Sequence, residues 1–254
     1  MNISEHSQKV AGLFGRIARW YDFLNHFLSL GIDIYWRYRL VRSMPMPSEG
    51  IALDLAAGTL DVSREILRQH PGAKILAMDF SLPMLLTGQK KLAKANTNEL
   101  NSIFSLQADA RAIPLPDESV DSVSIAFGIR NILPRSKAYA EILRVLKPGG
   151  TLCILEFGTG KKKVWKGLYN FYLSRILPLI GKVVSKDAIA YSYLAETICN
   201  FPGPHELGRE IVQAGFSRVF FYPLSSGIVY VHVARKSGEP GKSCLQKVPF
   251  CRQC

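Results

Sequence analysis

The residues with the clearest chemistry surround a turn of small residues next to a short apolar run. Residues 51–53 form the run, Asp54 interrupts it, and the turn that follows contains Ala56, Gly58 and Thr59. Small residues let the backbone approach a ligand closely, because no bulky side chain stands between them. Such a turn between a buried strand and a helix is typical of sites that hold nucleotide-like ligands. We therefore predict a ligand site here, with an ordinary strand–turn–helix connection as the alternative.

The turn does not match the two common phosphate-binding patterns. A P-loop has a Lys-Ser or Lys-Thr pair after its glycines, and neither pair follows Gly58. The dinucleotide fingerprint has three glycines, of which only Gly58 is present. A looser turn suits an adenosine that carries no phosphate, as in S-adenosylmethionine. The candidate cofactor-binding residues at this turn are Asp54, Ala56, Gly58 and Thr59.

Asp79 and Asp109 follow the next two predicted strands. Asp79 ends the strand at residues 74–78, one βαβ unit after Asp54, where an acidic residue accepts hydrogen bonds from both ribose hydroxyls. Asp109 follows the strand at residues 103–107 and is placed to bond the adenine amino group. The pairing of Asp54 with Asp79 is more specific for a nucleoside than either residue alone.

These side chains require a parallel sheet whose strands alternate with helices. Further strands are predicted at residues 121–126, 151–157, 218–222 and 228–234. Helical spacing predicts helices at residues 4–28, 34–43, 61–70, 81–95 and 135–146, and a tight turn at residues 147–150. The expected fold class is α/β, with a seven-stranded, mostly parallel sheet whose last strand is antiparallel.

The helix predicted at residues 4–28 precedes the sheet and has one apolar face. Tyr21 and Asn25 lie four residues apart and so share that face. One interpretation places both side chains over the ligand, with the helix as a roof. The alternative makes Tyr21 an ordinary core aromatic residue.

Composition indicates an ordered globular chain with an anionic partner. The chain has 254 residues, 48% of them hydrophobic, and a formal charge of +12, which suits nucleic acid or an anionic membrane face, with solubility alone as the alternative role of the charge. Its five cysteines are odd in number and scattered, which argues against a disulfide framework and favours the cytoplasm. Three of them fall in the tail at residues 236–254 and have no evident fourth ligand, so no metal site is expected. The polar N-terminus has no signal-peptide pattern.

Motifs spread over most of the chain resemble the ubiquinone/menaquinone-biosynthesis C-methyltransferase family. They are WYDFLN and SLGIDIYWR near the N-terminus, DLAAGTLD, AMD, LQADARAIPLPDESVDSV, FGIRN, RVLKPGG, LEF and YSYLAETICNFP. The glycine turn and LKPGG are general to methyltransferases, whereas FGIRN together with YSYLAETICNFP is specific to this family. The resemblance runs from about Val10 to Ala234 and implies a class I S-adenosylmethionine-dependent methyltransferase fold, which is Rossmann-like.

The resemblance also implies positions for the cofactor contacts. The family's contacts fall on Thr59, Asp79, Asp109 and Ala110. The chain departs from the family pattern at two positions. Leu60 stands where a small residue is usual, and Ala126 replaces a serine in the part of the site assigned to the cofactor. A leucine in the turn narrows the methionine end of the site or shifts the backbone.

The substrate that the resemblance implies is a polyprenyl quinol, whose ring carbon attacks a sulfonium methyl group. The expected reaction converts demethylmenaquinol to menaquinol, with a 2-methoxy-6-polyprenyl-1,4-benzoquinol as the alternative substrate. The ring becomes nucleophilic when its neighbouring hydroxyl loses a proton. Arginine keeps its own proton and is a poor base, so Arg130 is expected to stabilise the phenolate or to order a water molecule. Asn131, Tyr21 and Asn25 are expected to orient the hydroxyls.

Two structural alternatives accompany these assignments. Arg130 could instead form a salt bridge with Asp121 or Asp117. Residues 165–184 form a long aromatic stretch after the lysines at residues 161–163, which suits the surface of a membrane or a helix packed on the sheet.

The expected organisation is one domain over residues 1–235, with a helical cap at 1–48 and inserted, substrate- or membrane-facing helices at 160–200. The flexible tail at residues 236–254 follows. Peripheral association with the inner face of the cell membrane and a homodimer are also expected, without a nucleic-acid partner.

Other functions fit the motifs less well. Amino-methylating enzymes of nucleic acids carry an Asn/Asp-Pro-Pro-Tyr/Phe box after the fourth strand, and cytosine-methylating enzymes need a Pro-Cys nucleophile. This chain has AFGIRN at that place. A binding module without turnover is the remaining alternative, and Leu60 is the residue that motivates it.

Overall fold

The computed structural model describes residues 8, 10–16, 18, 22, 25–26, 29–94, 101–158, 193, 196–198 and 200–238. Within this part of the chain, seven strands form one sheet in the order β3-β2-β1-β4-β5-β7-β6. The strands are β1 (Ile51–Leu55), β2 (Lys74–Asp79), β3 (Ile103–Gln107), β4 (Val120–Ala126), β5 (Leu146–Phe157), β6 (Arg218–Leu224) and β7 (Val229–Arg235). β7 runs antiparallel to both β5 and β6, and the other described pairings are parallel. The predicted mixed sheet with an antiparallel last strand is confirmed.

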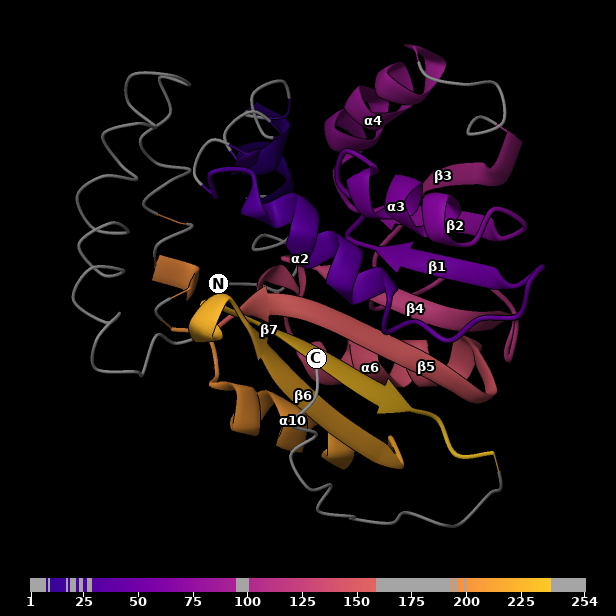
Figure 1. The fold of residues 1–254 in the computed structure, drawn as a ribbon, viewed down its shortest axis with the longest axis vertical. Coiled ribbons are helices and arrows are strands. Elements are labelled where there is room, and N and C mark those ends of the chain that lie inside the picture. The colour runs from indigo at the N-terminus through magenta and orange to yellow at the C-terminus, as the bar shows by residue number, and fades with distance from the viewer. Residues whose placement is uncertain are drawn as a thin grey trace.

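Helices cover both faces of this sheet (Figure 1). The described helices are α2 (Ile32–Val41), α3 (Asp61–Gln69), α4 (Leu82–Lys94), α6 (Arg135–Val145) and α10 (Pro204–Gln213), with 3-10 turns η1 (Ile129–Asn131) and η3 (Ser225–Gly227). One core cluster joins α2, α3 and α4 to the sheet, and a second joins α6 and α10 to it. Strands buried on both faces carry apolar runs, which explains residues 51–53 of β1 and 152–155 of β5.

The strand order creates a ligand crevice at the end of β1. β1 pairs with β2 on one side and with β4 on the other, so the chain leaves its centre in opposite directions. In open α/β sheets, ligands bind beyond the carboxyl ends of the strands at such a switch point. The turn that the sequence singled out follows β1 at this point.

The tight turn predicted at residues 147–150 is wrong. The segment lies within β5, between Leu146, which pairs with Val120 of β4, and Thr151, which pairs with Ser122, so residues 147–150 stand opposite Asp121 as an irregularity in the register. Gly149 has a φ of 78°, and a Cβ on Gly150 would lie 3.0 Å from the backbone oxygen of Asp121. The glycines therefore let the strand begin with a bulge against its neighbour, where the sequence pattern predicted a turn.

Several predictions fall partly or wholly outside the described residues. Every described residue between positions 4 and 28 is helical, as expected. Tyr21, the lysines at residues 161–163, the stretch at 165–184 and residues 239–254 lie outside the described part of the chain. The predicted division into a cap, inserted helices and a tail stays a prediction.

Candidate active site

A cavity lies at the carboxyl edge of the sheet, below the N-terminal helix. Its described walls come from that helix and from the segments that follow β1, β2, β3 and β4. The lining residues are Val10, Ala11, Phe14, Leu55, Ala56, Gly58, Met78, Asp79, Phe80, Ser81, Met84, Ala108, Asp109, Ala110, Arg111, Ala126, Phe127, Gly128, Asn131 and Ile132. The cavity thus brings together seven of the predicted site residues, namely Ala56, Gly58, Asp79, Asp109, Ala110, Ala126 and Asn131.

Asp79 connects the turn after β1 to the start of α4. Its Oδ2 accepts a hydrogen bond of 2.8 Å from the backbone N–H of Gly58, and its Oδ1 accepts one of 2.7 Å from that of Ser81. Burial raises the pKa of Asp79, and these two hydrogen bonds oppose the rise. A carboxylate oxygen can accept more than one hydrogen bond, so both oxygens keep capacity for a ligand. The geometry supports the predicted contact with two ribose hydroxyls.

The backbone around the cavity repeatedly takes the left-handed conformation. Ala56, Leu60 and Phe127 have φ values of 54°, 68° and 55°, and Gly58 has 55°. Non-glycine residues in this region are strained, and such strain clusters at functional sites. A Cβ on Gly128 would lie 2.4 Å from the Cβ of Ala56, so only glycine lets the segment after β4 approach the turn this closely.

Leu60 packs beneath the turn and does not line the cavity. Its side chain is fully buried in the core that α3 and α4 share with the sheet. A Cβ on Gly88 of α4 would lie 2.5 Å from the Leu60 Cγ, so the helix approaches the leucine closely at a glycine. This packing argues against the idea that Leu60 narrows the methionine end of the cofactor site.

Leu60→Gly is therefore expected to lower stability and to leave cofactor affinity unchanged or weaker. Removing a buried leucine costs about 2–5 kcal/mol, while glycine relieves about 1–2 kcal/mol of left-handed strain. The net loss should be roughly 1–3 kcal/mol, measured by thermal and denaturant unfolding. Leu60→Ala is the matched control and should be less stable than Leu60→Gly, because alanine keeps the strain. Tighter cofactor binding with unchanged stability would support crowding instead.

Asp54 lies within β1, beneath the turn, and outside the described cavity wall. Its two oxygens accept hydrogen bonds of 2.8 Å from the Ser124 hydroxyl and 2.7 Å from the Ser63 hydroxyl. Its expected place as a cofactor ligand therefore has no geometric support. The reason is that the carboxylate is buried within the sheet, away from the cavity wall, where it ties β1 to β4 and to α3. Burial raises the pKa of Asp54 to about 6, with a further rise from the charge of Asp79 and opposition from the serines.

The raised pKa of Asp54 predicts a stability that depends on pH. The folded state holds this proton more tightly than the unfolded chain, whose ordinary value is 3.8. Its stabilising contribution is full below that value and is lost as pH rises through about 6. Between about pH 4 and pH 7, the unfolding free energy should fall by roughly 2–3 kcal/mol relative to Asp54→Asn. Parallel curves for the two proteins would refute the assignment.

Asp109 is engaged by a neighbour that the sequence analysis did not single out. The Arg111 side chain donates to Asp109 Oδ1 at 2.9 Å from Nε and to Oδ2 at 2.6 Å from Nη2. Burial alone would raise the pKa of Asp109, but these bonds outweigh it, so the pKa is lowered. Arg111 also donates to the backbone oxygen of Leu133 at 2.6 Å, which joins the segments after β3 and η1. The sequence signal that could have indicated this ion pair is that Asp109 and Arg111 lie two positions apart.

Thr59 faces the N-terminal helix. Its hydroxyl donates to Asp22 Oδ1, and Asp22 Oδ2 accepts a bond of 2.7 Å from Lys91 of α4. Thr59 is buried and is not among the described cavity-lining residues. In this arrangement its hydroxyl ties the cap to the turn, and the cofactor contact implied by the resemblance stays a prediction.

Arg130 forms a buried ion pair with Glu156. Nη1 of Arg130, in η1, and Oε1 of Glu156, near the end of β5, are 2.6 Å apart. The alternative partners named from the sequence were wrong. Asp121 is the second residue of β4, about 17 Å along the strand from its end, and pairs with Lys147, while Asp117 pairs with Arg144. Arg130 is also not among the described lining residues of the cavity.

Asn131 lines the cavity and has a partner from a distant segment. The Tyr193 hydroxyl donates to Asn131 Oδ1 at 3.2 Å. Tyr193 belongs to the YSYLAETICNFP motif, so this contact gives part of that motif a place at the site. Asn25 is helical and partly buried but is not among the described lining residues, and Tyr21 lies outside the described residues. The N-terminal helix instead lines the cavity with Val10, Ala11 and Phe14 among its described residues.

Comparison with known proteins places the chain in a family. A model of the ubiE/COQ5 methyltransferase family matches residues 2–236. The chain belongs to the ubiE/COQ5 methyltransferase family. It is 39% identical over 235 residues to a ubiquinone/menaquinone biosynthesis C-methyltransferase of Geobacter sulfurreducens, covering 92% of this chain and 91% of the relative. It is 40% identical over 230 residues to that of Syntrophotalea carbinolica, covering 91% and 95%.

Solved structures confirm the class I methyltransferase fold of this ubiE/COQ5 family member. A methyltransferase of Thermotoga maritima, described as a possible histamine N-methyltransferase, superposes with a TM-score of 0.62 at 19% identity, covering 89% of this chain and 99% of that one. A methyltransferase of Aquifex aeolicus gives a TM-score of 0.55 at 18% identity, covering 78% and 88%.

S-adenosyl-L-methionine, which the turn predicted, is the cofactor of this ubiE/COQ5 methyltransferase. The described cavity fits a nucleoside that carries no phosphate. Asp79 offers a carboxylate at the end of β2, and Phe80 and Met84 supply apolar wall. The basic residue among the described lining, Arg111, is already engaged by Asp109. These are the features expected for a ribose and an adenine ring.

Proposed function

We propose that this enzyme transfers a methyl group to a ring carbon of a polyprenyl quinol, converting demethylmenaquinol to menaquinol. The family match over residues 2–236 is the observation that carries the proposal. The relatives are named for C-methylation in ubiquinone and menaquinone biosynthesis, so a benzoquinol is the alternative substrate. When bound, S-adenosyl-L-methionine supplies the electrophilic methyl group.

The protein's own part is to bind, align and stabilise charge. Asp79 is proposed to bind the ribose hydroxyls, while Asp109 and Ala110 lie beside the adenine. Arg130 is proposed to stabilise the phenolate that makes the ring carbon nucleophilic, and Asn131 to orient the ring hydroxyls. Alignment and charge stabilisation are the contributions that a fixed site makes to such a transfer.

An anaerobic assay tests this function. The full chain is incubated with methyl-labelled cofactor and, in separate reactions, with demethylmenaquinol and with the methoxy benzoquinol. Label in the naphthoquinol product supports the proposal, and label only in the benzoquinol product supports the alternative. Cofactor binding without transfer to either quinol would favour a module that has lost turnover.

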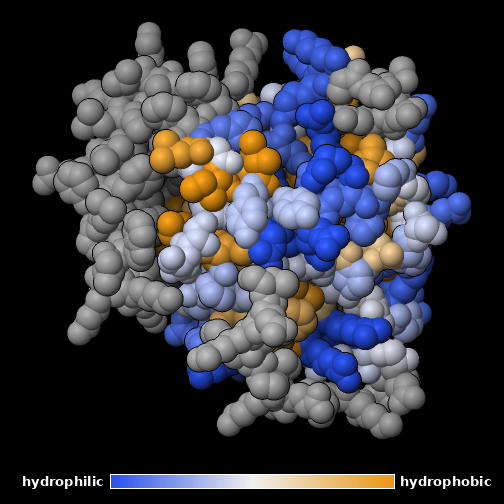
Figure 2. Space-filling view, in the orientation of Figure 1, coloured by the Kyte–Doolittle hydropathy of each residue, from blue (hydrophilic) through white to orange (hydrophobic). Residues whose placement is uncertain are grey.

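We also propose that the enzyme works at a membrane surface as a peripheral protein. The lysines at residues 161–163 suggest it from sequence, and exposed apolar side chains near the start of α2, among them Leu30, Ile34 and Tyr35, support it (Figure 2). Among the described residues, no helix is long and apolar enough to cross a membrane. Binding to anionic vesicles should weaken as salt rises and when the three lysines become glutamines. Salt-independent binding would contradict it.

A homodimer is a separate proposal that sedimentation would test.

A further inference from the structure

The ion pair between Arg130 and Glu156 is almost completely buried. The two side chains are 3% and 1% exposed, and Glu156 Oε1 also accepts a bond of 3.0 Å from the backbone N–H of Phe157. Removing two charges from water is costly, and an apolar pair of similar size is often as stable. Stability alone is therefore a weak explanation for the pair, which lies at the edge of the sheet where the cavity opens.

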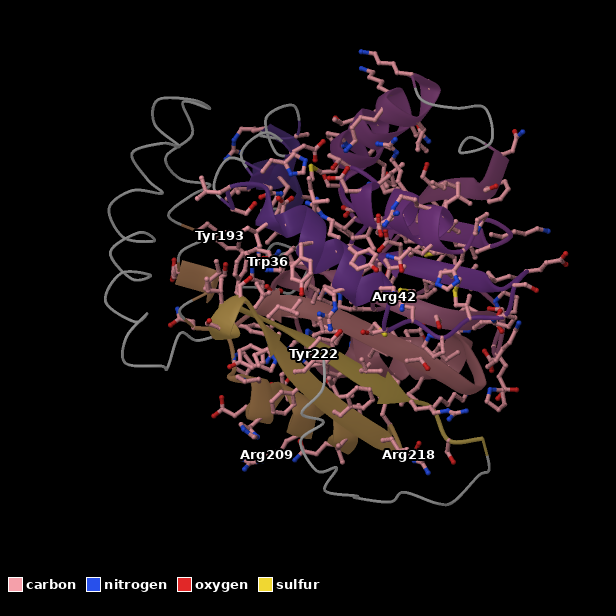
Figure 3. All side chains as sticks on the ribbon, in the orientation of Figure 1. Trp36, Arg42, Tyr193, Arg209, Arg218 and Tyr222 are labelled. Carbon is pink, nitrogen blue, oxygen red and sulfur yellow. The ribbon has the colours of Figure 1, made fainter. Side chains whose placement is uncertain are left out.

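An aromatic side chain packs against the guanidinium and links it to a cluster of rings at the cavity. The Arg130 guanidinium carbon lies 5.7 Å from the centre of the Phe157 ring. The Phe157 ring is 4.8 Å from that of Phe127, which lines the cavity, and Trp36 contacts both rings. Trp36 and Tyr193 lie at the same end of the sheet (Figure 3). The pair is thus coupled to the cavity wall through packed rings.

The ion pair also contains polar atoms without hydrogen-bond partners among the described residues. Within the described part of the chain, Arg130 Nε and Glu156 Oε2 are buried and have no hydrogen-bond partner. Buried polar atoms are nearly always paired, so an exception calls for a functional explanation. Since Glu156 holds Nη1, the Nε–H donor of the guanidinium is fixed in direction without being used by the carboxylate.

We propose that Glu156 is a positioning residue for methyl transfer. It fixes the guanidinium of Arg130 so that a free N–H donor is held for the oxygen of the substrate hydroxyl. The proposal rests on the proposed quinol methylation and adds to it a role for the LEF motif. Glu156 acts through Arg130 and does not itself take the proton from the ring.

Two conservative variants separate position from charge. Glu156→Asp keeps the negative charge but withdraws the acceptor by one methylene group, whereas Glu156→Gln keeps the length and an oxygen acceptor but removes the charge. Displacement of a catalytic group by about 1 Å can cost about 100-fold in rate. We expect kcat to fall about 10- to 100-fold in Glu156→Asp and to fall less in Glu156→Gln, which keeps an oxygen acceptor in place. The KM for quinol and the cofactor Kd should change little in both variants.

A pH profile distinguishes positioning from a structural role. If the displaced arginine stabilises the phenolate less, the rising, acidic limb of the kcat/KM profile in Glu156→Asp should move to higher pH, as in Arg130→Met. A smaller active fraction would lower the rate at every pH without moving that limb. The double variant Arg130→Met/Glu156→Asp should be no slower than Arg130→Met, because effects that act through one group are not additive.

Three results would overturn the role of Glu156. They are a slower Glu156→Gln than Glu156→Asp, an unmoved pH limb, and additive losses in the double variant. Loss of folding or cofactor binding in both single variants would also overturn it, since the pair would then be structural. Turnover of quinol by the wild-type enzyme is a separate test of the proposed function. Without quinol turnover in the wild type, the proposed function fails and this role falls with it, whereas an active wild type confines the failure to Glu156.

Discussion

Arg130→Met is expected to lower quinol turnover by about two to three orders of magnitude while cofactor binding stays intact. The reason is that a fixed donor aimed at developing charge contributes roughly 3–4 kcal/mol to transition-state stabilisation. Arg130→Lys should recover only part of the rate, because a point charge does not reproduce the planar fork. Raising the pH should rescue the methionine variant more than the wild type if phenolate formation is limiting. The measurements are kcat, KM and their pH profiles.

The buried partner of Arg130 determines the control for this experiment. Removing the arginine leaves Glu156 as a buried, unpaired carboxylate, and breaking such a pair costs about 3–5 kcal/mol of stability. The double variant Arg130→Met/Glu156→Gln removes that charge and should regain stability without regaining turnover. If Arg130→Met keeps its rate within a few-fold of the wild type, the residue is structural. Tyr21 is then the next candidate for stabilising the phenolate.

Asp79→Ala is expected to weaken S-adenosyl-L-methionine binding by roughly 1.5–3 kcal/mol, which is about a 10- to 150-fold rise in Kd. Part of the loss comes from the ribose hydrogen bonds. Another part comes from the turn, because Asp79 also accepts the backbone N–H groups of Gly58 and Ser81. Isothermal titration measures the change directly.

Asp79→Asn separates the two contributions. The amide keeps one oxygen acceptor at the same length, so it should retain one of the two backbone hydrogen bonds and part of the affinity. Thermal unfolding of both variants shows how much the turn itself has loosened. An unchanged Kd in Asp79→Ala would show that the ribose is bound elsewhere. That result would remove the assignment of Asp79 while leaving the methyltransferase fold in place.

The sequence predicted the strands and their order of appearance well, because their signals are local. Residues 74–78 and 103–107 are apolar runs bounded by small or polar residues, and both became strands at those positions, with Asp79 added to the first. The segment at 147–150 was missed because glycines mark turns and bulges alike. Only the neighbouring strand β4 decides which of the two forms.

The same difference between local signals and contacts across the fold applies to the residues of the site. Asp79, Asp109 and Asn131 could be placed from the sequence, because the end of a strand locates a side chain at one edge of the sheet. The partners of Arg130, Thr59 and Asp109 are contacts between side chains. Such contacts have no local signal in the sequence, and for Arg130 the carboxylates predicted from it were the wrong ones.

The sequence by itself therefore determined the sheet, the turn, the family and the edge at which the chemistry takes place. The tertiary structure decided how the charges there are paired. Asp54 became a buried support because Ser63 and Ser124 reach both of its oxygens, and Arg130 was paired because β5 ends beside η1 with Glu156. Strand and turn signals depend on neighbours in the chain, whereas pairing depends on which side chains meet across strands. That meeting is fixed only when the sheet assembles.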